Sequence, residues 1–275
     1  MLHFWEKKDF IELIKKMNLL SLEMHECAEV NFFCECTNTF SFNRLFTVFK
    51  SNGKSYIEQV STKQRFYLQA GCTYFISSAE ELSCHFEVGT HFFSFHFDTI
   101  APSGEEFFFN SGLVIEEKDS QIWIEKVKQI FDEPTNPANV ILLKYLLLSK
   151  IVNYLPKLKS ADTKTENMVQ NKELFAYFRN YANAQTKITD LAKIVKVSPD
   201  SLSRYFSKHN GVTIKSYLNH SIAARASKLL RDPSLRVKEI ASILQFQNEY
   251  YFSRFFKRET GQSPTEFRKN FGIKI

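Results

Sequence analysis

The pattern of apolar and polar positions changes twice along the chain. Residues 1–20 carry apolar side chains at helical spacing, namely Phe10, Leu13, Ile14 and Met17, which predicts a helix. From about residue 30 to residue 115, short runs rich in Phe, Thr, Tyr and Val alternate with turn signals that contain glycine. These runs predict strands over residues 40–49, 56–60, 65–68, 73–76, 84–88 and 91–97. Short strands at this spacing predict a small antiparallel barrel or sandwich.

Two helices are expected after the strands. In residues 118–131, Trp123, Val127 and Ile130 line one side. The next helix, over residues 138–155, has 12 apolar residues among the 16 from 140 to 155. Because apolar side chains occupy more than one face, we expect one face to cover the barrel and another to meet a partner subunit. The apolar run is shorter than the roughly 20 residues that span a bilayer, so no membrane segment is expected.

The chain is expected to divide into two domains. Pro156 ends the apolar helix, and residues 157–170 contain almost nothing that could be buried, which is typical of a linker. We therefore predict an α+β protein with a β-rich domain over 1–156, a linker over 157–170, and an all-α domain over 171–275.

The segment after the linker is helical in pattern, and it repeats. Leu191 to Val197 matches Ile240 to Phe246 at an offset of 49 residues, and Leu202 to Phe206 matches Phe252 to Phe256 at an offset of 50. Gly211 and Gly261 close the two copies.

Each copy is typical of a helix-turn-helix unit. A small residue, Ala192 or Ala241, lets the second helix cross the first closely. An apolar turn residue, Val197 or Phe246, is expected to fill the angle between the helices. The expected anchors of the second helix are the pairs Leu202/Phe206 and Phe252/Phe256, and its expected caps are Ser198, followed by Pro199, and Asn248.

The remaining residues of each second helix would face outward and could contact the major groove of DNA. The candidate DNA-binding residues are Ser198, Asp200, Ser201, Ser203, Arg204 and Lys208 in the first copy, and Asn248, Glu249, Tyr250, Tyr251, Arg254 and Lys257 in the second. Tyr250 and Tyr251 stay open, because one of them could be partly core. Between the copies, residues 214–230 form a helix of about 25 Å, a spacer that could place the two recognition helices in successive major grooves.

Charge separates the two halves. Residues 171–275 hold 19 Lys and Arg against 8 Asp and Glu, a net of +11, whereas residues 1–170 hold 17 against 22, a net of −5. A basic half beside an acidic half favours a polyanionic partner for the C-terminal domain. Within that domain, Arg225 lies in the middle of a helix and is expected to form a structural ion pair.

The second copy carries an extended motif, and the connecting helix adds Arg225-Ala226 and Leu229-Leu230 to it. The motif consists of Ile240-Ala241, Phe246, Tyr251-Phe252, Arg254, Phe256-Lys257, Gly261, Ser263-Pro264 and Phe267-Arg268. On these residues the sequence from Lys187 to Phe271 resembles the AraC/XylS family of bacterial regulators. The resemblance implies a sequence-specific transcriptional regulator that is not an enzyme. Its partners would be double-stranded promoter DNA and, if it activates, RNA polymerase.

Two turn positions depart from the family pattern. Lys196 and Gln245 stand where the family usually has glycine. If both keep a positive φ, each turn is strained by about 1 kcal/mol.

The first half is similar to the family's cupin-like effector domain, on the strand texture and on the strand that ends in His96-Phe97-Asp98. This similarity implies a homodimer and a small-molecule effector, whose binding residues the sequence does not identify. The phenylalanine-rich interior could be a core or could line the effector pocket.

No metal or cofactor is expected. The five cysteines, Cys27, Cys34, Cys36, Cys72 and Cys84, are odd in number and follow no secretory leader, which favours reduced thiols in the cytoplasm. Cys34 and Cys36 would share one face of a strand, but no second pair completes a zinc site. His91 and His96 are five apart and would point to opposite faces of a strand, and His85 adds no further ligand.

Three rival functions fit the sequence less well. A barrel enzyme with an added DNA-binding domain would need converging catalytic groups, and the sequence suggests none. A DNA-repair methyl acceptor would need reactive cysteines near the helices, whereas residues 157–275 contain none. A purely architectural DNA binder would leave the large first domain without a role.

Overall fold

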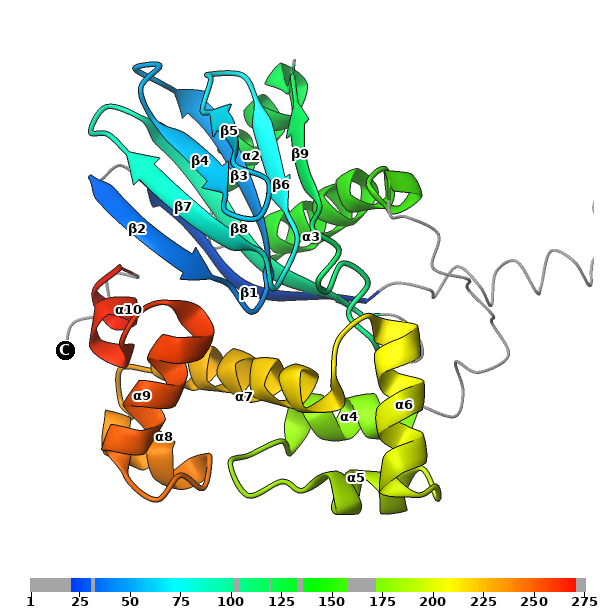
Figure 1. Cartoon of the computed structure of the whole chain (residues 1–275). Coiled ribbons are helices and arrows are strands. Elements are labelled where there is room, and N and C mark those ends of the chain that lie inside the picture. The colour runs from blue at the N-terminus through cyan, green and yellow to red at the C-terminus, as the bar shows by residue number, and fades with distance from the viewer. Residues whose placement is uncertain are drawn as a thin grey trace, which may run out of the picture.

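The computed structural model describes residues 21–30, 33–100, 104–118, 120–132, 136–157 and 172–270. The helix expected within residues 1–20 and nearly all of the expected linker lie outside these ranges. Figure 1 shows a β-domain stacked on a helical domain, with helix α7 (Ile214–Leu230) lying along the base of the sheets.

Two antiparallel sheets build the first domain. One sheet has the order β1-β8-β3-β6-β9 and the other has the order β2-β7-β4-β5. The strands are β1 (Ser21–Val30), β2 (Cys34–Thr39), β3 (Asn43–Lys50), β4 (Tyr56–Gln59), β5 (Gln64–Tyr67), β6 (Thr73–Ile76), β7 (Glu81–Phe86), β8 (His91–Ile100) and β9 (Val114–Glu117). All six expected strands exist, that over residues 73–76 with its predicted bounds and the other five with shifted ends, and β1, β2 and β9 were not predicted.

The five-stranded sheet is buried on both faces. Strand β8 directs Phe92 toward the core between the sheets, whereas Phe93 and Phe95 belong to the core shared with helices α2 and α3. Between the sheets, Phe46 meets Phe92 and Phe86 edge to face, with ring centroids 5.0 and 5.9 Å apart. The phenylalanine-rich interior is therefore packed as a core at this place.

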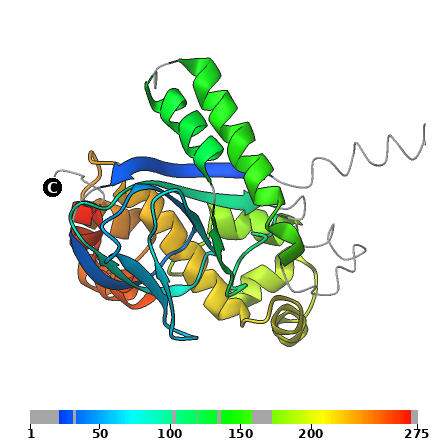
Figure 2. The ribbon, with the colours of Figure 1, turned by 90° about the horizontal axis from the view of Figure 1, so that it is seen from above.

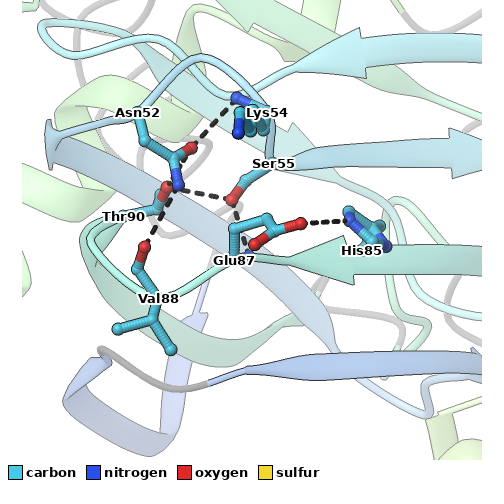
Figure 3. Close-up of polar contacts among 7 residues, drawn as sticks. All are labelled: Asn52, Lys54, Ser55, His85, Glu87, Val88 and Thr90. Carbon is cyan, nitrogen blue, oxygen red and sulfur yellow. Dashed lines mark hydrogen bonds and ion pairs between the residues drawn. The ribbon is translucent and has the colours of Figure 1, made fainter.

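The end predicted for the fifth strand was wrong, because residues 87–90 form a turn. Thr90 N donates to Glu87 O at 3.2 Å. Figure 3 shows that Asn52 fastens this turn by donating to Val88 O at 3.1 Å, while Ser55 Oγ lies 2.9 Å from Thr90 Oγ1 and accepts from Glu87 N at 2.9 Å. Because the turn uses these backbone groups, the strand cannot continue to Val88.

Two helices, α2 (Gln121–Asp132) and α3 (Pro137–Val152), follow the strands and project as a hairpin beside the sheets (Figure 2). Trp123 Nε1 donates to Thr47 Oγ1 at 2.8 Å, and Lys150 pairs with Glu117 at 2.7 Å, so both helices are fastened to the five-stranded sheet. The predicted end of the second helix at residue 155 was wrong, because α3 already ends at Val152, and Pro156 lies in a separate short 3-10 turn, η1 (Leu155–Lys157).

The outer face of α3 is not covered by any of the residues that the structure describes. Its exposed apolar side chains are Val140, Ile141, Leu142, Tyr145 and Val152. Counted from Pro137 to Lys157, the segment is 21 residues long and apolar enough to cross a membrane by length and composition. The expectation that the segment is shorter than a membrane span was therefore wrong once its flanking helical residues are counted. Two of its apolar side chains, Leu147 and Ile151, are nevertheless fully buried against the β-domain.

The two domains touch along α7 and at both of its ends. Phe109 of the β-domain packs edge to face on Tyr217 and His220 of α7, at 4.7 and 4.5 Å between centroids. Arg179 donates to Gly104 O. A Cβ built on Gly261 would lie only 2.5 Å from Thr37 O, so β2 touches the end of α9.

Candidate nucleic-acid interface

The first helix-turn-helix unit consists of α5 (Ile188–Ile194) and α6 (Pro199–Asn210), supported by α4 (Lys172–Asn180). Leu202 and Phe206 are both 2% exposed and anchor α6 in a core with Ala192, as predicted. The turn prediction was half wrong, because Val197 is 46% exposed. Val195 packs against the core in its place, since Lys196 reverses the chain before Val197.

The second unit consists of α8 (Val237–Ile243) and α9 (Glu249–Thr260), closed by α10 (Pro264–Asn270). Phe252 and Phe256 are fully buried, with ring centroids 5.9 Å apart. Phe246 packs on Phe252 at 5.4 Å and on Phe255 at 5.0 Å, so it fills the angle between the helices as predicted.

Both turns hold a non-glycine residue in the left-handed region. Lys196 has φ 56° and Gln245 has φ 58°, so both residues keep the positive φ expected of the glycine that the family usually has at these positions. A side chain in this region costs about 1 kcal/mol relative to glycine. The turns are therefore built as the family pattern predicts, with strain retained in each.

The predicted caps fix where each recognition helix begins. Ser198 Oγ accepts from Ser201 N at 3.1 Å, and Pro199 opens α6. Asn248 Oδ1 accepts from Tyr250 N at 3.0 Å and from Tyr251 N at 3.1 Å. Since the capped amides fix the backbone of the first turn, the directions in which its side chains leave the helix are set before any ligand arrives.

The candidate residues of α6 form one polar surface. Asp200, Ser201, Arg204 and Lys208 are exposed. Ser203 is half-buried and donates to Pro199 O at 2.8 Å, so its hydroxyl is already used within the helix. We infer that Ser203 contributes less to a contact than its exposed neighbours.

The corresponding surface of α9 is more aromatic. Tyr250 is 63% exposed and Tyr251 is 50% exposed, so the interpretation that one of them is core is wrong. The Arg254 guanidinium lies 5.6 Å from the centre of the Tyr250 ring. A guanidinium held against an aromatic face is partly oriented before binding. Glu249 and Lys257 complete the exposed set.

Helix α7 holds the two units in one body, as the spacer prediction required. Its bounds, Ile214–Leu230, are those predicted. Arg225 is structural as expected, but its partner is a backbone carbonyl, Ala182 O, and the ion-pair prediction was wrong. Ala184 N donates to Leu244 O at 2.9 Å, so the loop before the first unit also touches the second.

One structural arginine was not predicted from the sequence. Arg268 is 5% exposed and donates to Leu230 O at 3.0 Å and to Asp232 O at 3.3 Å. It ties α10 to the end of α7, and its burial keeps it from DNA. The motif contained Arg268, but spacing alone does not separate a buried arginine from an exposed one.

The recognition helices are placed so that their first turns are accessible. Figure 1 shows α6 and α9 at opposite ends of α7, each beginning on the side that faces away from the sheets. The exposed residues Asp200, Ser201, Tyr250 and Tyr251 belong to these first turns. A duplex could therefore approach both helices from the side opposite the β-domain.

A small cleft separates the two domains on the other side of α7. Its volume is about 100 Å³, and its lining includes Asp98, Glu106, Arg179, His220 and Arg225. Burial lowers the pKa of His220 to about 4, although the nearby Asp98 carboxylate opposes this shift. Burial raises the pKa of Glu106, and the charge of Asp98 adds to that rise.

Among the described residues, no group of three His, Cys, Asp or Glu side chains converges as a metal site would require. The three histidines considered as ligands have separate surroundings. His96 lies 2.7 Å from Ser94 Oγ and stacks on Phe42, whereas His85 lies 3.1 Å from Glu87. His91 packs edge to face on Phe49.

Comparison with known proteins agrees with this geometry. A helix-turn-helix domain family matches residues 191–270, which include both units. The C-terminal domain belongs to this helix-turn-helix family. The Arabinose operon regulatory protein of Escherichia coli is 32% identical to the chain over 87 residues, which are 32% of this chain and 30% of that protein.

Longer matches reach into the first domain. An uncharacterized HTH-type transcriptional regulator of Escherichia coli, YijO, is 30% identical over 131 residues, 46% of this chain and 45% of its own. The Msm operon regulatory protein of Streptococcus mutans is 25% identical over 144 residues, covering 51% and 52%. The chain thus spans about half the length of the curated relatives it matches.

The whole fold has a solved counterpart. ToxT from Vibrio cholerae O395 superposes with a TM-score of 0.63, covering 90% of this chain and 96% of its own, at 13% identity. The two proteins therefore share one fold, an antiparallel sheet domain followed by a helical domain.

Proposed function

We propose that the protein is a sequence-specific DNA-binding transcriptional regulator that inserts α6 and α9 into two successive major grooves. The observation that carries the proposal is the pair of capped, accessible first turns at opposite ends of one rigid helix. The net charge of +11 over residues 171–275 supports a polyanionic partner for this face. The curated relatives named as transcriptional regulators support it too.

Arg204 and Arg254 occupy equivalent exposed positions in α6 and α9 and are proposed to read bases. The planar fork of arginine fits the O6 and N7 atoms of guanine. Lys257, three residues after Arg254, is proposed to contact phosphate. DNA contact by the other candidate residues is proposed from their position on the same two surfaces.

The test begins with selection of a high-affinity duplex from a random pool, using the full chain. Arg204→Ala and Arg254→Ala should each weaken that duplex by about 1–3 kcal/mol and spare random DNA. Lys257→Ala should weaken both and flatten the salt dependence. Arg65→Ala, an equal charge change on exposed strand β5, is the control and should change neither. Failure of both arginine variants to alter binding would refute the assignment of the recognition helices.

We further propose that the β-domain, residues 1–156, binds a small-molecule effector that acts across the domain boundary. The cleft at the domain boundary supports this, because its lining joins Asp98 of the β-domain to Arg179 and His220 of the helical domain, so a molecule bound there would contact both domains. The related fold of ToxT has been solved with an unsaturated fatty acid bound. Calorimetry with candidate small molecules, with and without the selected duplex, would detect reciprocal coupling between the two ligands.

We also propose a homodimer that forms through the uncovered face of α3. Five exposed apolar side chains on one helix are more than a surface in water normally gathers. A regulator of this kind acts in the cytoplasm, where its promoter DNA lies, and meets RNA polymerase there if it activates.

A further inference from the structure

Two cysteines lie opposite one another in the four-stranded sheet. Strand β2 pairs antiparallel with β7, and the register sets Cys36 directly across from Cys84. Directly opposed residues point to the same face of a sheet, and their Cα atoms lie about 4.5–5.5 Å apart. A disulfide bridges Cα separations of about 4.4–6.8 Å. The backbone is therefore already placed for a disulfide, while both thiols are reduced in this structure.

The two thiols differ in access. Cys84 is 1% exposed and belongs to the core between the sheets, whereas Cys36 is half-buried at the edge of that core. Asn38 Nδ2 directs an N–H at Cys36 Sγ over 2.9 Å. A donor in this position stabilises negative charge on the sulfur. Cys36 is thus the thiol that an oxidant reaches first, and Cys84 is placed to resolve the product.

The same strand touches a recognition helix. Gly261 ends α9 in the left-handed conformation, with φ 80°. A Cβ at this glycine would lie 2.5 Å from Thr37 O and 3.1 Å from Asn38 Cα, so the backbone of β2 lies directly against the end of the helix. Asn38 therefore links the Cys36 sulfur on one side to the end of α9 on the other.

We propose that Cys36 and Cys84 form a reversible disulfide in response to a peroxide, and that the disulfide changes how β2 supports α9. The Cys36 thiolate attacks one peroxide oxygen, the O–O bond breaks, and the hydroxide that leaves takes up the proton that the thiol had lost, which gives a sulfenic acid and one water molecule. The Cys84 sulfur then attacks the Cys36 sulfur, the S–O bond breaks, and the hydroxyl group leaves with the Cys84 thiol proton as a second water molecule. One hydrogen peroxide is reduced while two thiols are oxidised.

The structural consequence follows from the contacts. Because the backbone is already placed for the bond, the Cys36 sulfur need only turn toward Cys84, which takes it from its position beside Asn38. The Asn38 side chain then loses this hydrogen bond and changes its contact with Gly261 by a small movement of β2. That this movement alters DNA binding rests on the proposed function, whereas the disulfide itself does not.

The chemical test uses the full chain. After treatment with hydrogen peroxide and alkylation of the remaining thiols, mass spectrometry of unreduced peptides should show Cys36 joined to Cys84 and released by dithiothreitol. Cys84→Ser and Cys84→Ala should both lose the linked peptide. Cys72→Ser is the matched control and should keep it, because Cys72 is a buried cysteine that directly precedes β6 of the other sheet. A bond from Cys36 to Cys34 or to a second chain, or oxidation without any disulfide, would overturn the proposal.

The functional arm compares oxidised and reduced protein on the selected duplex. In the natural chain and in Cys72→Ser, the oxidised and reduced forms should differ several-fold in affinity for the duplex. In Cys36→Ser the two forms should bind it equally. Equal affinity of both forms, with the Cys36–Cys84 bond present, would overturn the coupling to α9. Absence of specific DNA binding in the reduced protein would refute the proposed function. The disulfide would still be tested separately, by the linked peptides that mass spectrometry detects.

Discussion

Two glycines at equivalent positions allow the energetic effect of the contact between the domains to be measured. Gly211 ends α6 with φ 67°, and Gly261 ends α9 with φ 80°. Their amides close the helices in the same way, through Ser207 O and Lys257 O. A Cβ at Gly211 would meet nothing within 4 Å, whereas a Cβ at Gly261 would lie 2.5 Å from Thr37 O. Of these two glycines, the second faces the β-domain.

The pair therefore separates two costs. Alanine at a positive φ costs about 1–2 kcal/mol at either position, and this part cancels in the comparison. The methyl group of Gly261→Ala must also displace backbone of β2, which cannot rotate away as a flexible side chain would. Overpacking of this kind costs about 1–3 kcal/mol. We expect Gly261→Ala to lose that much more unfolding free energy than Gly211→Ala in the full chain.

Denaturant unfolding of both variants, in the full chain and in a 171–275 fragment, measures the difference. In the fragment the β-domain is absent, so the two losses should agree to within about 0.5 kcal/mol. Equal losses in the full chain would show that β2 does not rest on α9 in solution. A difference that persists in the fragment would place its cause inside the helical domain.

Three further predictions concern the turn, a buried carboxyl and the free helix face. Gln245→Gly should stabilise the helical domain by about 0.5–1 kcal/mol because φ is 58°, whereas Ser242→Gly, within α8, should destabilise it on the same denaturant curve. Burial raises the pKa of Glu106 above 4.5, so its favourable contribution is present below pH 4.5 and is lost as pH rises through the native value. The unfolding free energy of the natural chain minus that of Glu106→Gln should therefore fall as pH rises, and a rising difference would contradict the sign. Sedimentation should give a dimer that Ile141→Glu, on the exposed face of α3, converts to a monomer, and a natural chain that is monomeric at micromolar concentration would exclude this interface.

The helical domain could be predicted closely because its signals are local. Asn248 caps α9 because its side-chain oxygen can accept from the free amides at the start of the helix. Leu202 and Phe206 are both apolar and four residues apart, so they lie on one face of α6 and are buried together. Val197 was misplaced because the left-handed residue before it rotates the following side chain outward. A periodic pattern contains no record of that rotation.

The sheet domain was predicted less completely, for a different reason. Strand β8 carries apolar side chains on both faces, since one face meets the second sheet and the other meets α2 and α3. Such strands are recognised as apolar runs. The edge strands β1 and β9 have polar residues among their apolar ones and depend on pairing with β8 and β6, respectively. That pairing is long-range and leaves no mark within the strand itself.

The contact between the domains could not be predicted from the sequence, because each residue in it has a complete local explanation. Gly261 is fully explained by its role at the end of α9, and Tyr217 of α7 is fully explained by its place in the core of the first unit. Only the fold reveals that Thr37 lies against the first and Phe109 against the second. A residue explained locally gives no signal of a second, distant partner.

Helix α7 is one of the elements through which the two domains are in contact. Its side chains divide between two cores, with Leu218 and Ile222 in that of the first unit and Ala226 and Leu230 in that of the second. A further side of the helix, at His220, faces the β-domain. Tyr217 of α7 packs on Phe109 of the β-domain and also on Phe206 of α6, so a shift of the β-domain along α7 would disturb a side chain that helps to position α6. Under the proposed function, the Tyr217 side chain would connect a change in the β-domain to the position of α6.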